Sequence, residues 1–204
     1  SMLPETAWDL AKKKRIKLPA DTIEEFRHFL VVSADCRSVN EYLARFEMPL
    51  QLLQDKESLS RVTYELVELL AGQGLIYAEI RFAPLLSVSS SMKTEQVIEA
   101  LLKGLQKGKE DFGVEYNVIT CAMRNHSQED NYKMIKTARE FLGKGVCAAD
   151  LAGAEAQYPM SEFMELFRKV KALDMPFTIH AGECGDAGNI ISAVEAGAKR
   201  VGHG

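Results

Sequence analysis

The stretch Pro176-Phe177-Thr178-Ile179-His180-Ala181-Gly182-Glu183 decides the fold class of this 204-residue sequence. Residues 176–180 have the composition of a strand that ends in an imidazole. Two small residues and a carboxylate follow this strand. Residues 189–196 have a helix pattern, and another strand begins at residue 199. A strand, a helix and a second strand in this order indicate a right-handed crossover within a parallel sheet.

The same unit repeats toward the N-terminus. Further strands are predicted at residues 75–82, 114–121 and 146–151, followed by helices at about 94–112, 128–142 and 161–173. The first 70 residues read as helices, including one at residues 60–70. Capping-box spacings, Asp21 with Glu24 and Ser38 with Glu41, predict two of the helix starts.

The residues at the strand ends predict how the parallel strands are arranged. No Gly-x-Gly-x-x-Gly comes after any strand, so the dinucleotide-binding fingerprint of a doubly wound sheet is absent. A polar or functional residue instead stands at the end of every strand, namely Arg81, Arg124, Asp150, His180 and His203. Strand ends that converge on one site are typical of barrel enzymes. We therefore predict an α/β protein with a (β/α)8 TIM barrel, as a single domain over residues 1–204 with about five strands.

Composition excludes several classes of partner. A hydrophobic fraction of 47% and a formal net charge of -4 are ordinary for a soluble protein and predict neither nucleic acid nor membrane binding. No apolar run approaches the roughly 20 residues of a membrane span. The four cysteines are scattered without a Cys-x-x-Cys pair, so no disulfide framework is predicted and a cytoplasmic location is expected.

The residues that indicate chemistry are His180, Glu183 and His203. An imidazole at a strand end can hold a zinc ion on a rigid support. A carboxylate shortly after it can exchange a proton with a bound substrate. A single histidine in a loop is more often structural, but His203 ends the next strand between two glycines, which is hard to explain by packing alone.

These motifs resemble the adenosine deaminase family. The resemblance is carried by residues 180–183 (His-Ala-Gly-Glu), 200–204 (Arg-Val-Gly-His-Gly), 150–155 (Asp-Leu-Ala-Gly-Ala-Glu), 121–124 (Cys-Ala-Met-Arg) and 42–46 (Tyr-Leu-Ala-Arg-Phe). It runs from Pro4 to Gly204. Each motif is weak by itself, whereas the five together are highly specific.

The resemblance implies a zinc-dependent barrel of the metallo-dependent hydrolase type that converts adenosine, or 2'-deoxyadenosine, to inosine and ammonia. His180 would ligate Zn2+, Glu183 would donate a proton to the purine, and His203 would orient or deprotonate the attacking water. The small-molecule purine nucleoside would be bound by Gly153, Asp150, Met123, Tyr42, Leu43 and Phe46.

The sequence also departs from the family. The family's first strand carries a His-x-His pair and a late strand carries an Asp-Asp pair, and neither is found in these 204 residues. We therefore expect a barrel that lacks its first and last strands, is inactive as given, and binds catalytic zinc weakly or not at all. Its exposed sheet edges would permit strand exchange or dimerisation.

Two other functions remain open. One is a sister deaminase that acts on adenine, AMP or an N6-modified purine, although the apolar segment at residues 42–46 favours a nucleoside. The other is a non-catalytic barrel remnant, against which stands the retention of Glu183 and His203. A cytidine-deaminase type of zinc site is disfavoured because Pro-Cys-x-x-Cys is missing.

Overall fold

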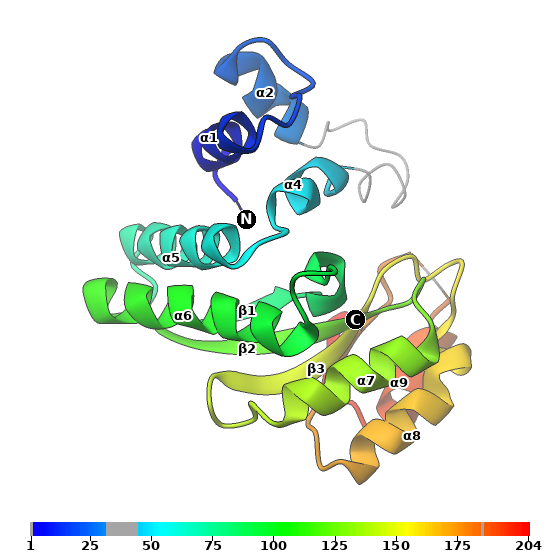
Figure 1. Cartoon of the computed structure of the whole chain (residues 1–204). Coiled ribbons are helices and arrows are strands. Elements are labelled where there is room, and N and C mark those ends of the chain that lie inside the picture. Colours follow the sequence, from blue (N-terminus) through cyan, green and yellow to red (C-terminus); the bar gives the residue numbers. More distant parts are fainter. Residues whose placement is uncertain (1, 32–44, 185) are drawn as a thin grey trace. The chain divides into compact units, whose positions relative to one another are not determined.

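The computed structural model describes residues 2–31, 45–184 and 186–204 (Figure 1). The chain divides into two compact units. Unit 1 comprises Ser1–Tyr77 and Leu86–Glu115, and unit 2 comprises Ala78–Leu85 and Tyr116–Gly204. The single domain expected over residues 1–204 stays a prediction.

Unit 2 holds the five described strands, except that the first residue of two of them, Tyr77 and Glu115, belongs to unit 1. The strands are β1 (Tyr77–Phe82), β2 (Glu115–Met123), β3 (Val146–Ala152), β4 (Thr178–Ala181) and β5 (Arg200–His203). The sheet orders are β1-β2-β3 and β4-β5, and the pairs β2–β3 and β4–β5 are parallel. A parallel bridge between Ala149 and Phe177 links the two sheets. Five described strands in chain order, with parallel pairing, confirm the predicted α/β class.

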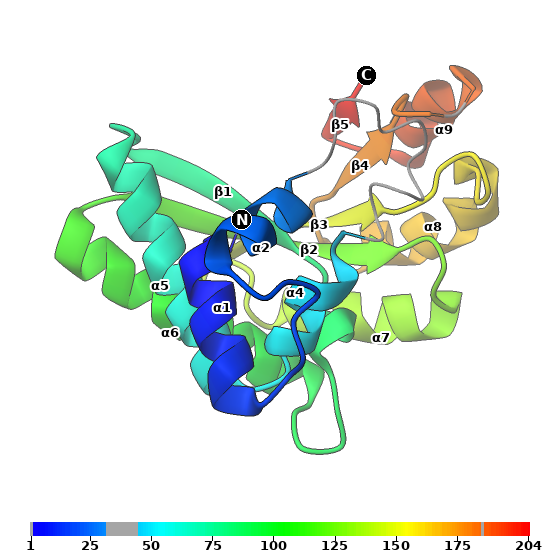
Figure 2. The ribbon, with the colours of Figure 1, turned by 90° about the horizontal axis from the view of Figure 1, so that it is seen from above.

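Three helices cover the strands of unit 2. They are α7 (Gln128–Arg139), α8 (Met164–Ala172) and α9 (Gly188–Ala196), and Figure 2 shows them following one another around the outside of the strands. The rings of Phe167 on α8 and Phe177 before β4 lie 4.7 Å apart, and both side chains are buried. Apolar packing of this kind holds each helix against its strands and leaves the strand ends to carry polar groups.

Unit 1 is mainly helical. It contains α1 (Pro4–Lys14), α2 (Ile23–Leu30), α4 (Glu47–Leu52), α5 (Lys56–Gly72) and α6 (Thr94–Phe112), and a short 3-10 helix, Pro84–Ser87, follows β1. The first three of these helices share a core of buried residues: Ala7, Leu10, Ala11, Phe26, Met48 and Leu52. The helix predicted at residues 60–70 is confirmed as the longer α5.

Several predicted boundaries differ from the structure by one to three residues, for example the helix predicted to end at residue 142, which ends at Arg139. Two helix starts also need correction. The first capping box is formed by Thr22 and Glu25, one residue later than predicted: the Thr22 hydroxyl accepts from the Glu25 amide at 3.2 Å, and the Glu25 carboxylate accepts from the Thr22 amide. The helix predicted at residues 161–173 begins instead with a 3-10 turn, Met160–Phe163. The box predicted at Ser38 and Glu41 lies outside the described residues.

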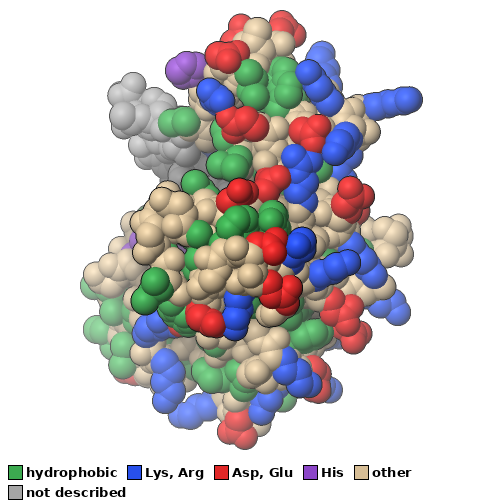
Figure 3. Space-filling view, turned by 90° about the vertical axis from the view of Figure 1, so that its left-hand side faces the viewer, with side chains coloured by type: hydrophobic (Ala, Val, Ile, Leu, Met, Phe, Trp, Pro, Cys, Tyr) green, Lys and Arg blue, Asp and Glu red, His purple; other side chains and the backbone are tan. Residues whose placement is uncertain are grey.

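The surface carries charges of both signs. Figure 3 shows Lys and Arg side chains interspersed with Asp and Glu on one face. In the described ranges, no helix combines the length and the apolar character needed to cross a membrane. The described cysteines Cys121, Cys147 and Cys184 are free thiols.

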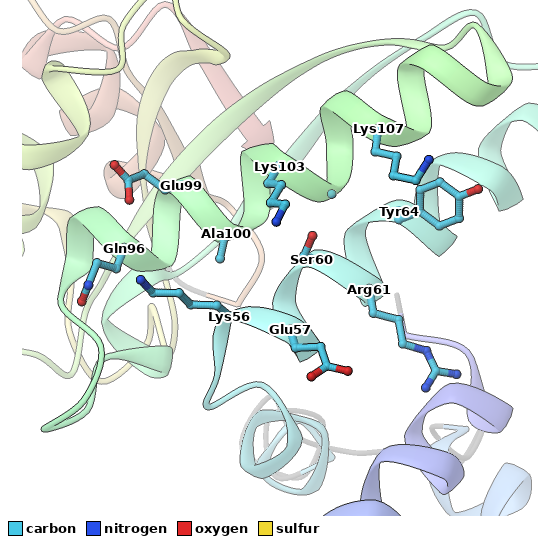
Figure 4. Close-up of a pocket in the computed structure, with 11 residues that line it drawn as sticks. Lys56, Glu57, Ser60, Arg61, Tyr64, Gln96, Glu99, Ala100, Lys103 and Lys107 are labelled. Carbon is cyan, nitrogen blue, oxygen red and sulfur yellow. The ribbon is translucent and has the colours of Figure 1, made fainter.

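Helices α5 and α6 approach each other closely because α6 carries glycines at the contact. A Cβ atom on Gly104 would lie 2.1 Å from the carbonyl oxygen of Ser60, and one on Gly108 would lie 2.6 Å from Cβ of Val67. Beside this contact lies a groove of about 690 Å³ lined by Lys56, Lys103 and other polar side chains of the two helices (Figure 4).

We predict that Gly104→Ala destabilises the protein. Alanine favours helices more than glycine does, by about 1 kcal/mol, but the added methyl group collides with backbone. We expect a net loss of about 1–3 kcal/mol in the free energy of unfolding, measured by urea denaturation followed by circular dichroism. The control is Gly72→Ala, where no atom lies within 4 Å of the new Cβ, and stability should hold or rise. Equal effects of the two changes would contradict the close approach of the helices.

Candidate active site

Two imidazoles meet at the ends of β4 and β5. The strands pair in parallel with His180 opposite Gly202 and Ala181 opposite His203. Strand alternation alone would point the two rings to opposite faces, but His203 has a φ of 74°, which breaks the alternation. The ring centroids are therefore only 5.2 Å apart.

A carboxylate joins the two imidazoles. Glu183 follows β4 through a turn at Gly182, whose φ of 90° lies in the left-handed region that favours glycine. An Oε2 atom of Glu183 lies 3.7 Å from Nε2 of His203, and both side chains are partly exposed. The structure thus brings together the three residues that the sequence singled out for chemistry.

Asp150 lies behind His180. It stands in β3 and is fully buried, and its Oδ1 accepts from the amide of Leu151 at 2.8 Å. Its Oδ2 lies 2.8 Å from Nδ1 of His180, although the ring N–H does not point along that line. Arg81, at the end of β1, places Nε 3.5 Å from the same oxygen. The other ring nitrogen, Nε2, faces away from this carboxylate and lies 3.4 Å from Nη1 of Arg81.

Two predicted substrate residues lie together at the ends of β2 and β3. Gly153 has a φ of 114°, and a Cβ atom there would lie 3.7 Å from Cε of Met123. The buried Asn131 holds the backbone of Met123 from both sides, with its Oδ1 accepting from the amide at 3.0 Å and its Nδ2 donating to the carbonyl at 2.9 Å. The sequence did not indicate Asn131, whose partners are backbone atoms.

The structure leaves three of the predicted substrate-binding residues untested. Tyr42 and Leu43 lie outside the described residues. Phe46 belongs to unit 1 and is 46% exposed. The roles of all three residues stay predictions.

Burial shifts the pKa of two groups near the strand ends. Desolvation raises the pKa of the Cys121 thiol well above its usual value, and the negative charge of Asp150 acts in the same direction. Cys121 is therefore a protonated thiol and is unsuited to act as a nucleophile. Desolvation also lowers the pKa of the buried Arg124, while the negative charge of Glu155 opposes that shift.

The described residues do not form a metal site, although His180 is a candidate ligand. His180, backed by the Asp150 carboxylate, has the setting of a metal-binding histidine. Catalytic zinc ions take three protein ligands, however. Within the described part of the chain, no group of three His, Cys, Asp or Glu side chains could hold a metal ion. These residues alone do not fit the metal.

Successive β/α units whose strand ends carry acid–base side chains are the arrangement found in barrel enzymes. The chain belongs to the adenosine deaminase family, whose pattern it matches over residues 1–204. This confirms the resemblance stated from the motifs.

Two curated relatives illustrate the match. The chain is 40% identical over 205 residues to the adenosine deaminase of Clostridium perfringens strain SM101, covering 100% of this chain and 62% of the relative. It is 37% identical to that of Enterococcus faecalis, covering 100% and 60%. The chain thus spans about 60% of the length of these relatives.

Solved structures show the same fold. An adenine deaminase from Arthrobacter aurescens superposes with a TM-score of 0.85 at 25% identity, covering 98% of this chain and 60% of that one. An N6-mAMP deaminase from Arabidopsis gives 0.77 at 26% identity, with 98% and 60% covered. A zinc-bound amidohydrolase from Burkholderia ambifaria gives 0.82 at 21% identity, with 97% and 54% covered, and shares the fold. They confirm the predicted TIM barrel, of which this chain forms part.

We predict that Gly182→Ala strains the turn between His180 and Glu183. A left-handed φ costs a non-glycine residue about 1–2 kcal/mol, and the new Cβ would lie 2.9 Å from Cδ1 of Ile190. Stability to urea should fall by about that amount. The control is Gly188→Ala at the start of α9, where the nearest atom to a Cβ is 3.7 Å away and stability should stay unchanged. A Gly182→Ala protein as stable as its control would refute the assigned backbone conformation.

Proposed function

We propose that the full protein hydrolyses adenosine and 2'-deoxyadenosine to the corresponding inosines and ammonia. The observation that carries this proposal is the meeting of His180, Glu183 and His203 at the ends of β4 and β5. The curated relatives at 37–40% identity, which are named adenosine deaminases, support the same reaction.

Glu183 and His203 would handle the protons. Water adds to C6 of the purine, the bond between C6 and the exocyclic nitrogen breaks, and ammonia leaves as the ring carbonyl forms. Glu183 would protonate the ring nitrogen beside C6, which makes that carbon more electrophilic. His203 would take the proton of the attacking water. The distance of 3.7 Å between Oε2 of Glu183 and Nε2 of His203 supports a shared target for the two groups.

His180 would serve as one zinc ligand through Nε2, with the ring oriented by Asp150. Zinc held there would supply an activated water, but the described residues lack the further ligands that it needs. Asp150 is fully buried, so it would act on the substrate through His180 rather than by touching it.

Gly153 and Met123 would bind the purine. A glycine at φ 114° leaves its backbone N–H open to a ring nitrogen, and the flexible methionine beside it offers an apolar contact for a flat base. Neither contact depends on what is attached to the base. Deamination of adenine or of an N6-modified nucleotide is therefore the second candidate, favoured by structural neighbours that carry those names.

The proposal is tested on the full-length protein with adenosine, adenine and AMP, following ultraviolet absorbance and ammonia release. We expect adenosine to give the highest kcat/KM. Faster turnover of adenine or AMP would favour the second candidate. No turnover of any of the three would favour a non-catalytic barrel.

We predict that Glu183→Gln lowers kcat by about 10²–10⁴-fold, because glutamine keeps the shape of the side chain but cannot donate the proton. KM should change little. The matched control is Glu195→Gln on α9, the same chemical change at an exposed position. A kcat for Glu183→Gln within tenfold of the wild-type value would contradict the assigned role.

We also predict that residues 1–204 expressed alone bind no stoichiometric zinc and release no ammonia from adenosine. These residues supply one candidate imidazole ligand, whereas a catalytic zinc ion takes three protein ligands. Even the loss of a residue that only hydrogen-bonds to a ligand weakens metal binding by about 10–100-fold. Elemental analysis after dialysis against zinc gives the metal content, with the full-length protein as the control. One zinc per chain together with inosine formation would show that this prediction is wrong.

A further inference from the structure

The turn between His180 and Glu183 presents a row of backbone donors. The amides of Gly182, Glu183 and Cys184 follow one another just after β4, where no neighbouring strand receives them. Successive amides of this kind form a concave site for a negative group. The three residues are themselves exposed, and each of their amides nevertheless bonds to an acceptor in the protein.

Glu155 is that acceptor. Its Oε1 accepts from the amide of Gly182 at 2.9 Å, and its Oε2 accepts from the amides of Glu183 at 3.0 Å and Cys184 at 3.3 Å. The residue is 2% exposed and follows β3 by a short turn. One buried carboxylate therefore ties the end of β3 to the backbone of the candidate proton donor.

Arg124 holds the other side of the same turn. It follows β2 directly and is 2% exposed. Its Nη2 donates to the carbonyl of His180 at 2.8 Å, its Nη1 donates to the carbonyl of Tyr158 at 2.6 Å, and its guanidinium lies over the ring of Phe163. The backbone of His180 is thus held by a buried positive charge, and that of Glu183 by a buried negative one.

We propose that Glu155 and Arg124 are positioning residues for the deaminase reaction, because together they fix the Glu183 carboxylate relative to the His180 imidazole. Neither side chain needs to touch the substrate. Reacting groups must be held within a fraction of an ångström, and a displacement of about 1 Å can cost roughly 10²-fold in rate. This inference rests on the proposed function, since it assigns the two residues to that reaction.

The test uses Glu155→Gln in the full-length protein. Glutamine keeps the size of the side chain, but its amide nitrogen would face a backbone N–H, so at least one of the three amides loses its acceptor. We expect kcat per folded molecule to fall by about 10–100-fold, with KM nearly unchanged. We also expect a larger solvent deuterium isotope effect on kcat, because the proton transfer from Glu183 becomes slower.

Hydrogen exchange provides an independent measurement on the same variant. The amides of Gly182, Glu183 and Cys184 should exchange faster in Glu155→Gln than in the wild type. Glu195→Gln is the matched control, since it makes the same change on exposed α9 and should leave exchange and kcat unaltered. A thermal melt of each variant gives the folded fraction by which kcat is corrected.

Two results would overturn the proposal. Faster exchange with an unchanged corrected kcat would make the contact purely structural, and unchanged exchange would show that Glu155 does not hold the turn. If Glu155→Gln fails to fold, Arg124→Lys is measured in the same way, because lysine keeps the charge but cannot donate to both carbonyls. A wild-type protein without deaminase activity would instead refute the proposed function, and the exchange data would still decide whether Glu155 holds the turn.

Discussion

The parallel pairing of β4 with β5 is the constraint on which the candidate site depends. It sets His180 and His203 on neighbouring strands one residue out of step, and the left-handed φ of His203 then turns the second ring toward the first. A shift of one residue in this register would move the His180 side chain to the other face of its strand. Gly202 lies opposite His180 and has no side chain. A Cβ atom there would lie 3.2 Å from Nη1 of Arg81 and 3.7 Å from Cδ2 of the His180 ring.

Buried charges reinforce that register. Asp150, Glu155 and Arg124 are each at most 2% exposed, which is costly unless the charges are hydrogen-bonded or paired. All three stand at or just after strand ends, and all three contact either His180 or the turn after it. The strands thus support the candidate site with buried charges, and electrostatic interactions are stronger away from water.

The sequence predicted the strands, and the residues that come together at their ends, better than it predicted the contacts that support them. Strand composition and the residues at strand ends located His180, Glu183 and His203, because those signals are local. The sequence showed Glu155 only as the last residue of the motif at residues 150–155. Its partners are three backbone amides nearly thirty residues further along the chain, and amides carry no side-chain signature. The same holds for Asn131, which binds only the backbone of Met123.

The proposed roles of the site residues would explain how one fold can accompany several purine deaminases. Glu183, His203 and Gly153 would act on the six-membered ring of the base, which adenine, adenosine and N6-methyl-AMP share. The groups that distinguish these molecules are the ribose, the phosphate and the substituent on the exocyclic nitrogen. The first two lie at the far side of the base from C6, so contacts away from the ends of β3, β4 and β5 must select between them. Chemistry and specificity are therefore separable here: changes to the support of the β4 turn should alter kcat for every purine alike, whereas changes to ribose or phosphate contacts should alter which purine is preferred.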